Sequence, residues 1–129
     1  MTLSLRARGA LALGIFLALI AGADRLAAQD AEAVDFGRTI QPVLARRCFP
    51  CHGPDKQEAG LRLDRRKIAV SELESGMRPI VPGQPDESEL LARISAEIDF
   101  LRMPPEGKPL SEEEIAAFRR WIAAGAEWE

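Results

Sequence analysis

The sequence contains no tyrosine, a single histidine and only two cysteines. Two cysteines cannot build the multi-disulfide framework that stabilises many small secreted domains. The absence of tyrosine removes one common hydroxyl group for acid–base catalysis. At 129 residues and 47% hydrophobic content, the chain has the size of one small globular domain, which excludes a multi-domain enzyme.

Neither positive nor negative charge strongly predominates in the chain. The 17 basic and 20 acidic residues give a formal net charge of −3, so no strongly basic surface exists to attract a phosphate backbone. We therefore expect no binding to nucleic acid. Aromatic residues make up only 5% of the chain, which predicts a thin apolar core. An internal prosthetic group would supply the missing apolar mass.

The N-terminal region is typical of a secretory signal peptide. Arg6 and Arg8 precede an uncharged apolar run over residues 10–23, which ends in the small residues Ala21, Gly22 and Ala23. A membrane span needs about 20 apolar residues, and this run is shorter. We therefore predict a signal peptide over residues 1–23, an exported protein of the periplasm or another extracytoplasmic compartment, and no stable membrane insertion after cleavage.

Cleavage is expected after Ala23 or, less typically for such signals, after Ala28. The small and charged residues 24–34 predict a flexible leader. The remaining residues 35–129 then form the folded domain.

The domain is predicted to be all-α, because apolar residues recur at helical spacing and no alternating strand pattern is present. The first helix is expected over residues 35–47, with a kink or a start near Pro42. A loop follows over residues 48–63, and Asp64 is a candidate cap for a short helix that ends at Leu73.

Two further helices are predicted in the second half. Asp86 or Ser88 is expected to cap a helix that carries Leu90, Leu91 and Ile94 on one face. The last helix has a capping box of Ser111 and Glu114 and ends at Gly125 in the C′ position. Its apolar stripe and that of the first helix are the best in the chain, so we expect these two helices to pack on each other. The apolar stripe of the last helix consists of Ile115, Phe118, Trp121 and Ile122.

The chemistry centres on the sequence Cys48-Phe-Pro-Cys51-His52. Two thiols three residues apart project to one side of a helical turn and can each add to a vinyl group of one haem. The imidazole that follows them is placed to ligate the iron. This is a c-type haem attachment motif, and it agrees with the export signal, since covalent haem is attached outside the cytoplasm.

The sequence disfavours three other uses of the cysteines. A structural zinc site needs four ligands, whereas Cys48, Cys51 and His52 are the only thiols and the only imidazole in the chain. A thioredoxin-like redox pair belongs to a βαβ context, which the sequence does not show. A disulfide across so short a loop would stabilise little.

The sixth ligand of a haem iron cannot be a second histidine from this chain. Methionine is the natural candidate, and Met77 and Met103 compete, because Met1 leaves with the signal peptide. Two prolines follow Met103 and restrict the backbone, so its thioether could be held at little ordering cost. Met77 lies in a loop rich in glycine and proline, and either residue could instead fill a gap in the core.

The order of these motifs resembles the planctomycete-type cytochrome c domain. The resemblance extends over nearly the whole mature chain and rests on Asp35-Phe36, Ile40-Gln-Pro42-Val-Leu44, Cys48-Phe-Pro-Cys51-His52-Gly-Pro-Asp55, Gly60-Leu-Arg-Leu-Asp64, Ile80-Val-Pro-Gly83, Ser88-Glu-Leu90, Arg93-Ile94, Met103-Pro-Pro105 and the segment from Leu110 to Trp128.

The resemblance implies a class I-like cytochrome c fold of three to five helices around one covalently attached haem c. It implies covalent attachment through Cys48 and Cys51, with His52 and Met103 as the axial ligands of the iron. The expected function is that of an exported mono-haem cytochrome, an electron carrier and not an enzyme, which transfers single electrons to and from redox partner proteins. In this family the domain is often the N-terminal module of a longer exported protein.

Several further residues are candidates for the surroundings of the haem. Phe49, Leu61, Leu63 and Trp121 are candidates to line it, with a core role an equal alternative for Leu63 and Trp121. A basic cluster could pair with haem propionates, dock an acidic partner or simply form a solvated face, and the solvated face is the preferred interpretation. The cluster consists of Arg62, Arg65, Arg66 and Lys67.

The sequence leaves two alternative functions open. If Met103 does not ligate, the open iron position could serve a haem-based sensor or a peroxidase-like enzyme. Against this, a peroxidase would need a distal histidine or a comparable group, and only an arginine could take that place. The other alternative is a binding module separated from a larger exported protein.

Overall fold

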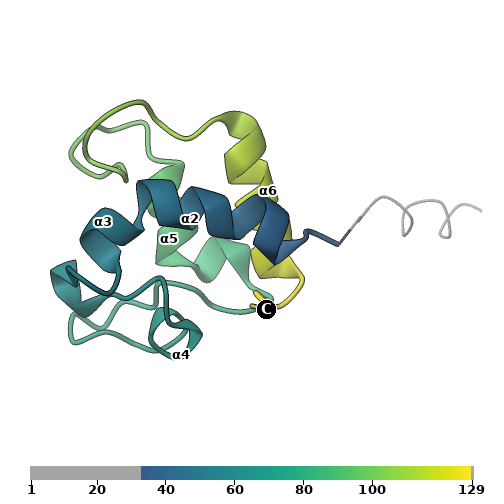
Figure 1. The fold of residues 1–129 in the computed structure, drawn as a ribbon, viewed down its shortest axis with the longest axis horizontal. Helices are drawn as coiled ribbons and strands as arrows, with labels where there is room; N and C mark the ends of the chain where they lie inside the picture. Colours follow the sequence, from purple (N-terminus) through teal and green to yellow (C-terminus); the bar gives the residue numbers. More distant parts are fainter. Residues whose placement is uncertain (1–32, 129) are drawn as a thin grey trace, which may run out of the picture. The chain divides into compact units, whose positions relative to one another are not determined.

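The computed structural model describes residues 33–128, and every regular element in this range is a helix (Figure 1). The all-α prediction, with three to five helices, is therefore confirmed. No helix in this range is long and apolar enough to cross a membrane. The predicted signal peptide, both cleavage positions and most of the leader lie outside the described residues. The elements are η1 (Phe36–Ile40), α2 (Gln41–Arg47), α3 (Phe49–His52), η2 (Glu58–Gly60), α4 (Arg66–Ala69), η3 (Pro85–Glu87), α5 (Glu89–Ile94) and α6 (Glu112–Ala123).

The first helical segment forms as the apolar spacing predicts. The carboxylate of Asp35 accepts a hydrogen bond from the Arg38 N–H at 2.9 Å and so caps the wide turn η1. The α-helix α2 begins at Gln41 and has Pro42 in its first turn, where the missing N–H of proline costs nothing. The proline therefore marks the start of the α-helix and does not interrupt it.

The last helix, α6, begins at the predicted capping box. The Glu114 N–H donates to Ser111 Oγ at 3.1 Å, and the Ser111 N–H donates back to Glu114 Oε2 at 2.8 Å. Gly125 follows the helix with a φ of +109°, a left-handed conformation that favours glycine. Both ends of α6 thus agree with the prediction.

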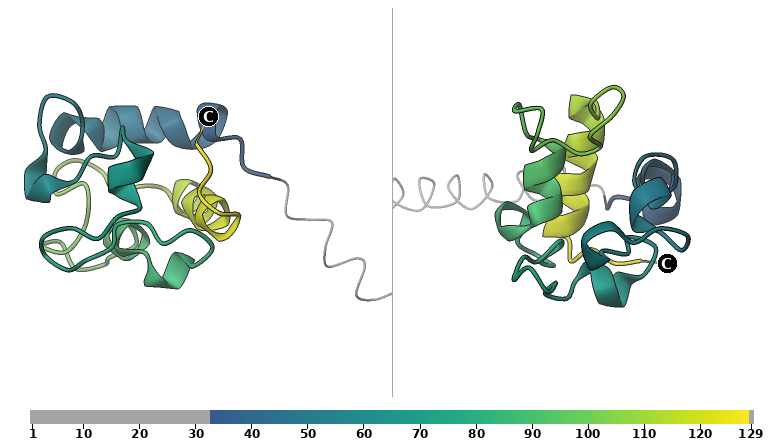
Figure 2. Two further views of the ribbon diagram at one scale, coloured as in Figure 1. Left: turned by 90° about the horizontal axis from the view of Figure 1, so that it is seen from below. Right: turned by 90° about the vertical axis from the view of Figure 1, so that its left-hand side faces the viewer.

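Aromatic side chains join the first and last helices. The ring centroids of Phe36 and Trp121 lie 5.6 Å apart, and Phe36 stacks on Trp128 at 5.2 Å. Phe118 meets Trp121 edge to face at 6.1 Å, a favoured arrangement for aromatic pairs. The expected packing of the two terminal helices is therefore confirmed. Helix α5 lies beside α6, as the two views of Figure 2 show.

Two helix caps differ from the prediction. Asp64 does not cap a helix, because its carboxylate binds the Arg62 guanidinium at 2.5 Å, and α4 spans only Arg66–Ala69 and stops short of Leu73. Ser88 occupies the N-cap position of α5, yet its hydroxyl donates to the Gln84 carbonyl at 3.0 Å. In both cases a nearer local partner competes with the helix end for the side chain.

Candidate functional site

The Cys48-to-His52 motif forms the helical turn that its spacing predicts, although it lies at the start of the stretch 48–63 that was expected to be a loop. The His52 N–H donates to the Cys48 carbonyl at 2.8 Å, and α3 follows α2 directly after Cys48. Positions three and four residues apart share one side of a helix. Cys48, Cys51 and His52 therefore face the same cavity, and all three line it.

A backbone carbonyl orients the imidazole of His52. The Nδ1 atom lies 3.1 Å from the carbonyl oxygen of Glu58, so the tautomer with its proton on Nδ1 donates a hydrogen bond there. This leaves the lone pair of Nε2 available to a metal ion. A backbone carbonyl on the other ring nitrogen is a usual partner of a metal-ligating histidine.

Gly53 allows the chain to reverse directly after the motif. A Cβ atom at this position would lie 2.5 Å from the carbonyl oxygen of Phe49, closer than real Cβ atoms approach. The Gly53 N–H donates to the Lys56 carbonyl at 2.8 Å and closes the turn. This turn returns Glu58 to the imidazole of His52.

The cavity beside this turn is large and predominantly apolar. It contains about 990 Å³ of space free of atoms, including the part open to solvent. A predominantly apolar lining with a few polar groups is typical of sites for organic ligands. Helices α2, α3, η2 and α5 and several loops supply the residues that line it: Arg47, Cys48, Cys51, His52, Glu58, Ala59, Leu61, Leu63, Leu73, Met77, Pro79, Glu89, Leu90, Arg93, Ile94, Met103, Pro104 and Pro105.

Both candidate methionines line this cavity. Met103 is half-buried, and its N–H donates to the Arg93 carbonyl at 3.0 Å. Met77 lies in a turn in which its carbonyl accepts from the Leu73 N–H at 2.9 Å, and 40% of the residue is exposed. The structure thus brings His52 and both methionines to one cavity and gives the more enclosed place to Met103.

The environment of Cys48 does not resemble that of a redox-active thiol. Burial raises its pKa from 9.0 to about 11, against the smaller lowering effect of the Arg47 charge. Reactive cysteines of the thioredoxin type have a lowered pKa instead. Cys48 and Cys51 are not joined by a disulfide. Within residues 33–128, no three His, Cys, Asp or Glu side chains gather in a group that could hold a metal ion.

The candidate lining residues divide into two pairs. Leu61 and Leu63 line the cavity, whereas Phe49 and Trp121 are not among its lining residues. Phe49 packs against the core from its edge. Trp121 is 2% exposed, and its Nε1–H donates to the Glu127 carbonyl at 2.8 Å. The core alternative therefore applies to Trp121, and Leu63 belongs to both core and cavity.

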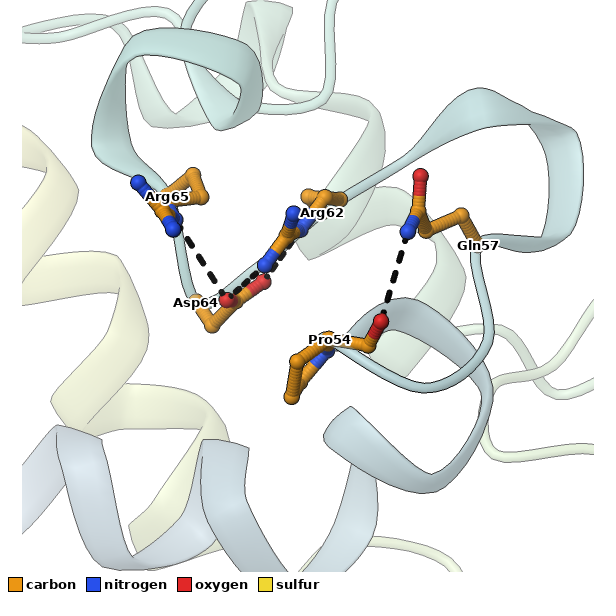
Figure 3. A network of polar contacts seen from close by, with 5 residues as sticks. All are labelled: Pro54, Gln57, Arg62, Asp64 and Arg65. Carbon is orange, nitrogen blue, oxygen red and sulfur yellow. Dashed lines mark hydrogen bonds and ion pairs between the residues drawn. The ribbon is translucent and has the colours of Figure 1, made fainter.

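The basic cluster of the sequence does not line the cavity. Arg62 binds both carboxylate oxygens of Asp64, and Arg65 Nε lies 3.8 Å from the same carboxylate (Figure 3). Arg66 donates to the Ala126 carbonyl at 3.0 Å and holds the C-terminal segment. The suggested pairing with propionates gains no support from these positions.

Two arginines that sequence reasoning missed do line the cavity. Arg47 donates to the Lys108 carbonyl, and Arg93 Nε donates to Glu89 Oε1 at 2.7 Å. Arg47 directly precedes Cys48, and Glu89 and Arg93 have the i,i+4 spacing of a helical ion pair. These are the signals that could have identified them.

The features of the cavity fit haem c. Two thiols and an imidazole lie on one helical turn, thioethers approach from loops, and apolar side chains cover most of the surface. The guanidinium group of Arg47, which also lines the cavity, is suited to the carboxylates that haem carries. The fold and the cavity together define a small all-α domain of the cytochrome c-like class.

The particular family follows from a comparison with family models. Residues 48–107 match the model described as Planctomycete cytochrome C, a range that includes the Cys48-to-His52 motif and Met103. This match supports a planctomycete-type cytochrome c domain in this part of the chain, and it suggests a haem-binding cytochrome with haem c as its cofactor. Comparisons with curated proteins and with solved structures find no match.

Proposed function

We propose that the chain is an exported mono-haem cytochrome that carries single electrons between redox partner proteins. One haem c is attached through Cys48 and Cys51, and His52 and Met103 ligate its iron. The observation that carries this proposal is the meeting of Cys48, Cys51, His52 and Met103 at one apolar cavity. These residues come from two segments far apart in the sequence.

The bound haem supplies an iron that gains or loses one electron. The residues of the chain keep the ligands in place during this change. The hydrogen bond from His52 Nδ1 to Glu58 fixes the plane of the imidazole, and the Met103 N–H is fixed to the Arg93 carbonyl. Ligands that stay bound require little reorganisation with each electron, which favours outer-sphere transfer.

The side chains around the ligands influence the reduction potential. Leu61, Leu63, Leu90 and Ile94 line the cavity and limit the access of water to it. A methionine and histidine ligand pair raises the potential, as does burial, because both favour the ferrous state with its lower charge. We therefore propose a carrier of relatively high potential.

Cytochrome c domains are typically extracytoplasmic, which supports export as part of the proposal. The predicted cleavage sites make it testable by N-terminal sequencing of the protein from the periplasm of the host. The mature chain is expected to begin at Asp24 or at Gln29. A chain that keeps Met1 in the cytoplasm would contradict export.

The central experiment is the intact mass of the chain produced in a host with c-type haem maturation. We expect an added mass equal to one haem, which remains under denaturing conditions because the linkage is covalent. The variant with Cys48→Ser and Cys51→Ser should lose it, while Ser71→Ala, which changes a surface serine elsewhere, should retain it. A wild-type chain without added mass would overturn the proposal.

A second function has one observation in its favour. The Arg93 side chain lines the same cavity as Met103 and contacts the Leu101 carbonyl, two residues before Met103. An arginine in this place could assist chemistry at an open iron position. The domain would then be a sensor or a peroxidase-like enzyme. Rapid binding of imidazole or peroxide to the wild-type ferric protein would favour this second function over the carrier.

A further inference from the structure

The segment that bears Met103 connects α5 to α6 and arches over one end of the domain (Figure 1). Its end before α6 is anchored to the core by Leu110, which is 5% exposed, but the apolar side chains before Met103 are not anchored in this way. Phe100 is 83% exposed, and Ile98 is 52% exposed. Since burial contributes little to holding the part of the segment before Met103, the position of this part at the cavity depends on polar contacts.

Arg93 supplies two of these contacts from the last turn of α5. Its backbone carbonyl accepts the Met103 N–H at 3.0 Å, and its Nη1 donates to the Leu101 carbonyl at 3.4 Å. The backbone and the side chain of one residue thus hold the segment at two points, with Met103 at one of them.

The guanidinium of Arg93 is itself held in place. Its Nε donates to Glu89 Oε1 at 2.7 Å, and only 29% of the Arg93 side chain is exposed. A half-buried pair of this kind restricts the side chain to the geometry that reaches Leu101. Glu89 and Arg93 also line the cavity, so this polar pair lies beside Met103.

We propose that Arg93 is a positioning residue for Met103, an inference that rests on the function proposed above. Arg93 limits how far the Met103 segment can move away from the cavity, and so determines how often the thioether leaves the iron. The part of the segment after Met103 is held independently, because the Arg47 guanidinium donates to the Lys108 carbonyl. Loss of the Arg93 side chain should therefore loosen the segment without releasing it completely.

The test is the rate at which imidazole binds to the ferric iron of the holoprotein. At saturating imidazole this rate reports how often Met103 leaves the iron. Arg93→Gln should raise the rate severalfold, because both the contact to the Leu101 carbonyl and the ion pair with Glu89 that orients the guanidinium are lost. Arg93→Lys keeps the charge and one donor, so it should restore part of the difference.

Arg119→Gln is the matched control. Arg119 also pairs with a carboxylate, that of Asp86 at 2.6 Å, but it lies on α6 and is not a lining residue of the cavity. A general loss of surface pairing would affect both variants, whereas a positioning role affects only Arg93→Gln. Hydrogen exchange of the holoprotein adds a second readout, in which the amides of residues 98–103 should exchange faster in Arg93→Gln alone.

The outcomes separate this inference from the proposed function. If Met103→Ala binds imidazole much faster than wild type, but Arg93→Gln matches wild type, then Met103 ligates and only the role of Arg93 is wrong. If Met103→Ala and wild type are equally fast, the ligation by Met103 and the role of Arg93 both fail. Should Arg93→Gln not yield holoprotein, Glu89→Gln should still raise the rate, and an unchanged rate there would overturn the inference.

Discussion

The Nδ1 atom of His52 lies 3.1 Å from the carbonyl oxygen of Glu58, and this contact fixes which ring nitrogen faces the cavity. It depends on the reversal of the chain at Gly53, where any Cβ atom would meet the Phe49 carbonyl. The attachment motif and the loop after it thus form one unit, in which the loop orients the ligand. A proton on Nδ1 also makes His52 a better ligand through Nε2.

The first prediction concerns His52. His52→Ala should abolish stable holoprotein, because the iron loses the ligand that the helical turn presents. Haem content per chain is the measurement. Gln57→Ala is the control, since Gln57 lies in the same loop and its side chain makes only a contact of 3.4 Å to the Pro54 carbonyl (Figure 3). Normal haem content and an unaltered low-spin spectrum in His52→Ala would contradict the proposed role.

The second prediction compares the two methionines. Met103→Ala should lower the reduction potential by a substantial part of the roughly 0.8 V range that axial ligands span, and it should let imidazole bind the iron. Met77→Ala should leave both properties near wild type, because 40% of Met77 is exposed. Potentiometric titration of both variants is the measurement. The reverse pattern would reassign the sixth ligand to Met77.

The third prediction concerns the ion pair of Arg62 and Asp64. The hydrogen bond from Arg62 lowers the pKa of Asp64 below its ordinary value of 3.8. A lowered pKa in the folded state adds stability above pH 3.8, and this stability is lost as the pH falls through the folded-state pKa. Arg62→Gln should therefore be less stable than wild type at pH 7, and the difference should shrink in acid.

Chemical unfolding of the holoprotein at several pH values measures this difference. Arg65→Gln is the control, because Arg65 lies 3.8 Å from Asp64 and 65% of its side chain is exposed. A smaller effect is expected from it. A stability loss in Arg62→Gln that is the same at pH 7 and in acid would show that the carboxylate charge is not involved.

The fourth prediction concerns the capping box of α6. Ser111→Ala should lower the free energy of unfolding by about 1 kcal/mol, because the Glu114 N–H loses its acceptor. Ser95→Ala is the matched control, since Ser95 is exposed and lies outside any helix N-terminus. Thermal unfolding of the two variants is the measurement. Equal stability of both would mean that the cap is dispensable.

Much of the fold could be predicted from the sequence because the signals are local. The spacing of Phe36, Ile40 and Leu44 defines one helix face, and the residues Ser111 and Glu114 define a helix start. Asp64 shows where such reasoning failed. Its chain position suits a cap, but Arg62 two residues earlier offers a stronger partner, and only the fold determines which contact forms.

The candidate site, too, is predicted in part by the sequence and determined in part only by the tertiary structure. The sequence by itself determined the attachment motif, since the spacing of Cys48, Cys51 and His52 on a helical turn follows from helix geometry. Only the tertiary structure decided that Met103 reaches the same cavity, and that Arg47 and Arg93 line it while the arginines at 62–66 do not. The physical reason is that these contacts join distant segments, and their geometry follows from how the whole chain packs.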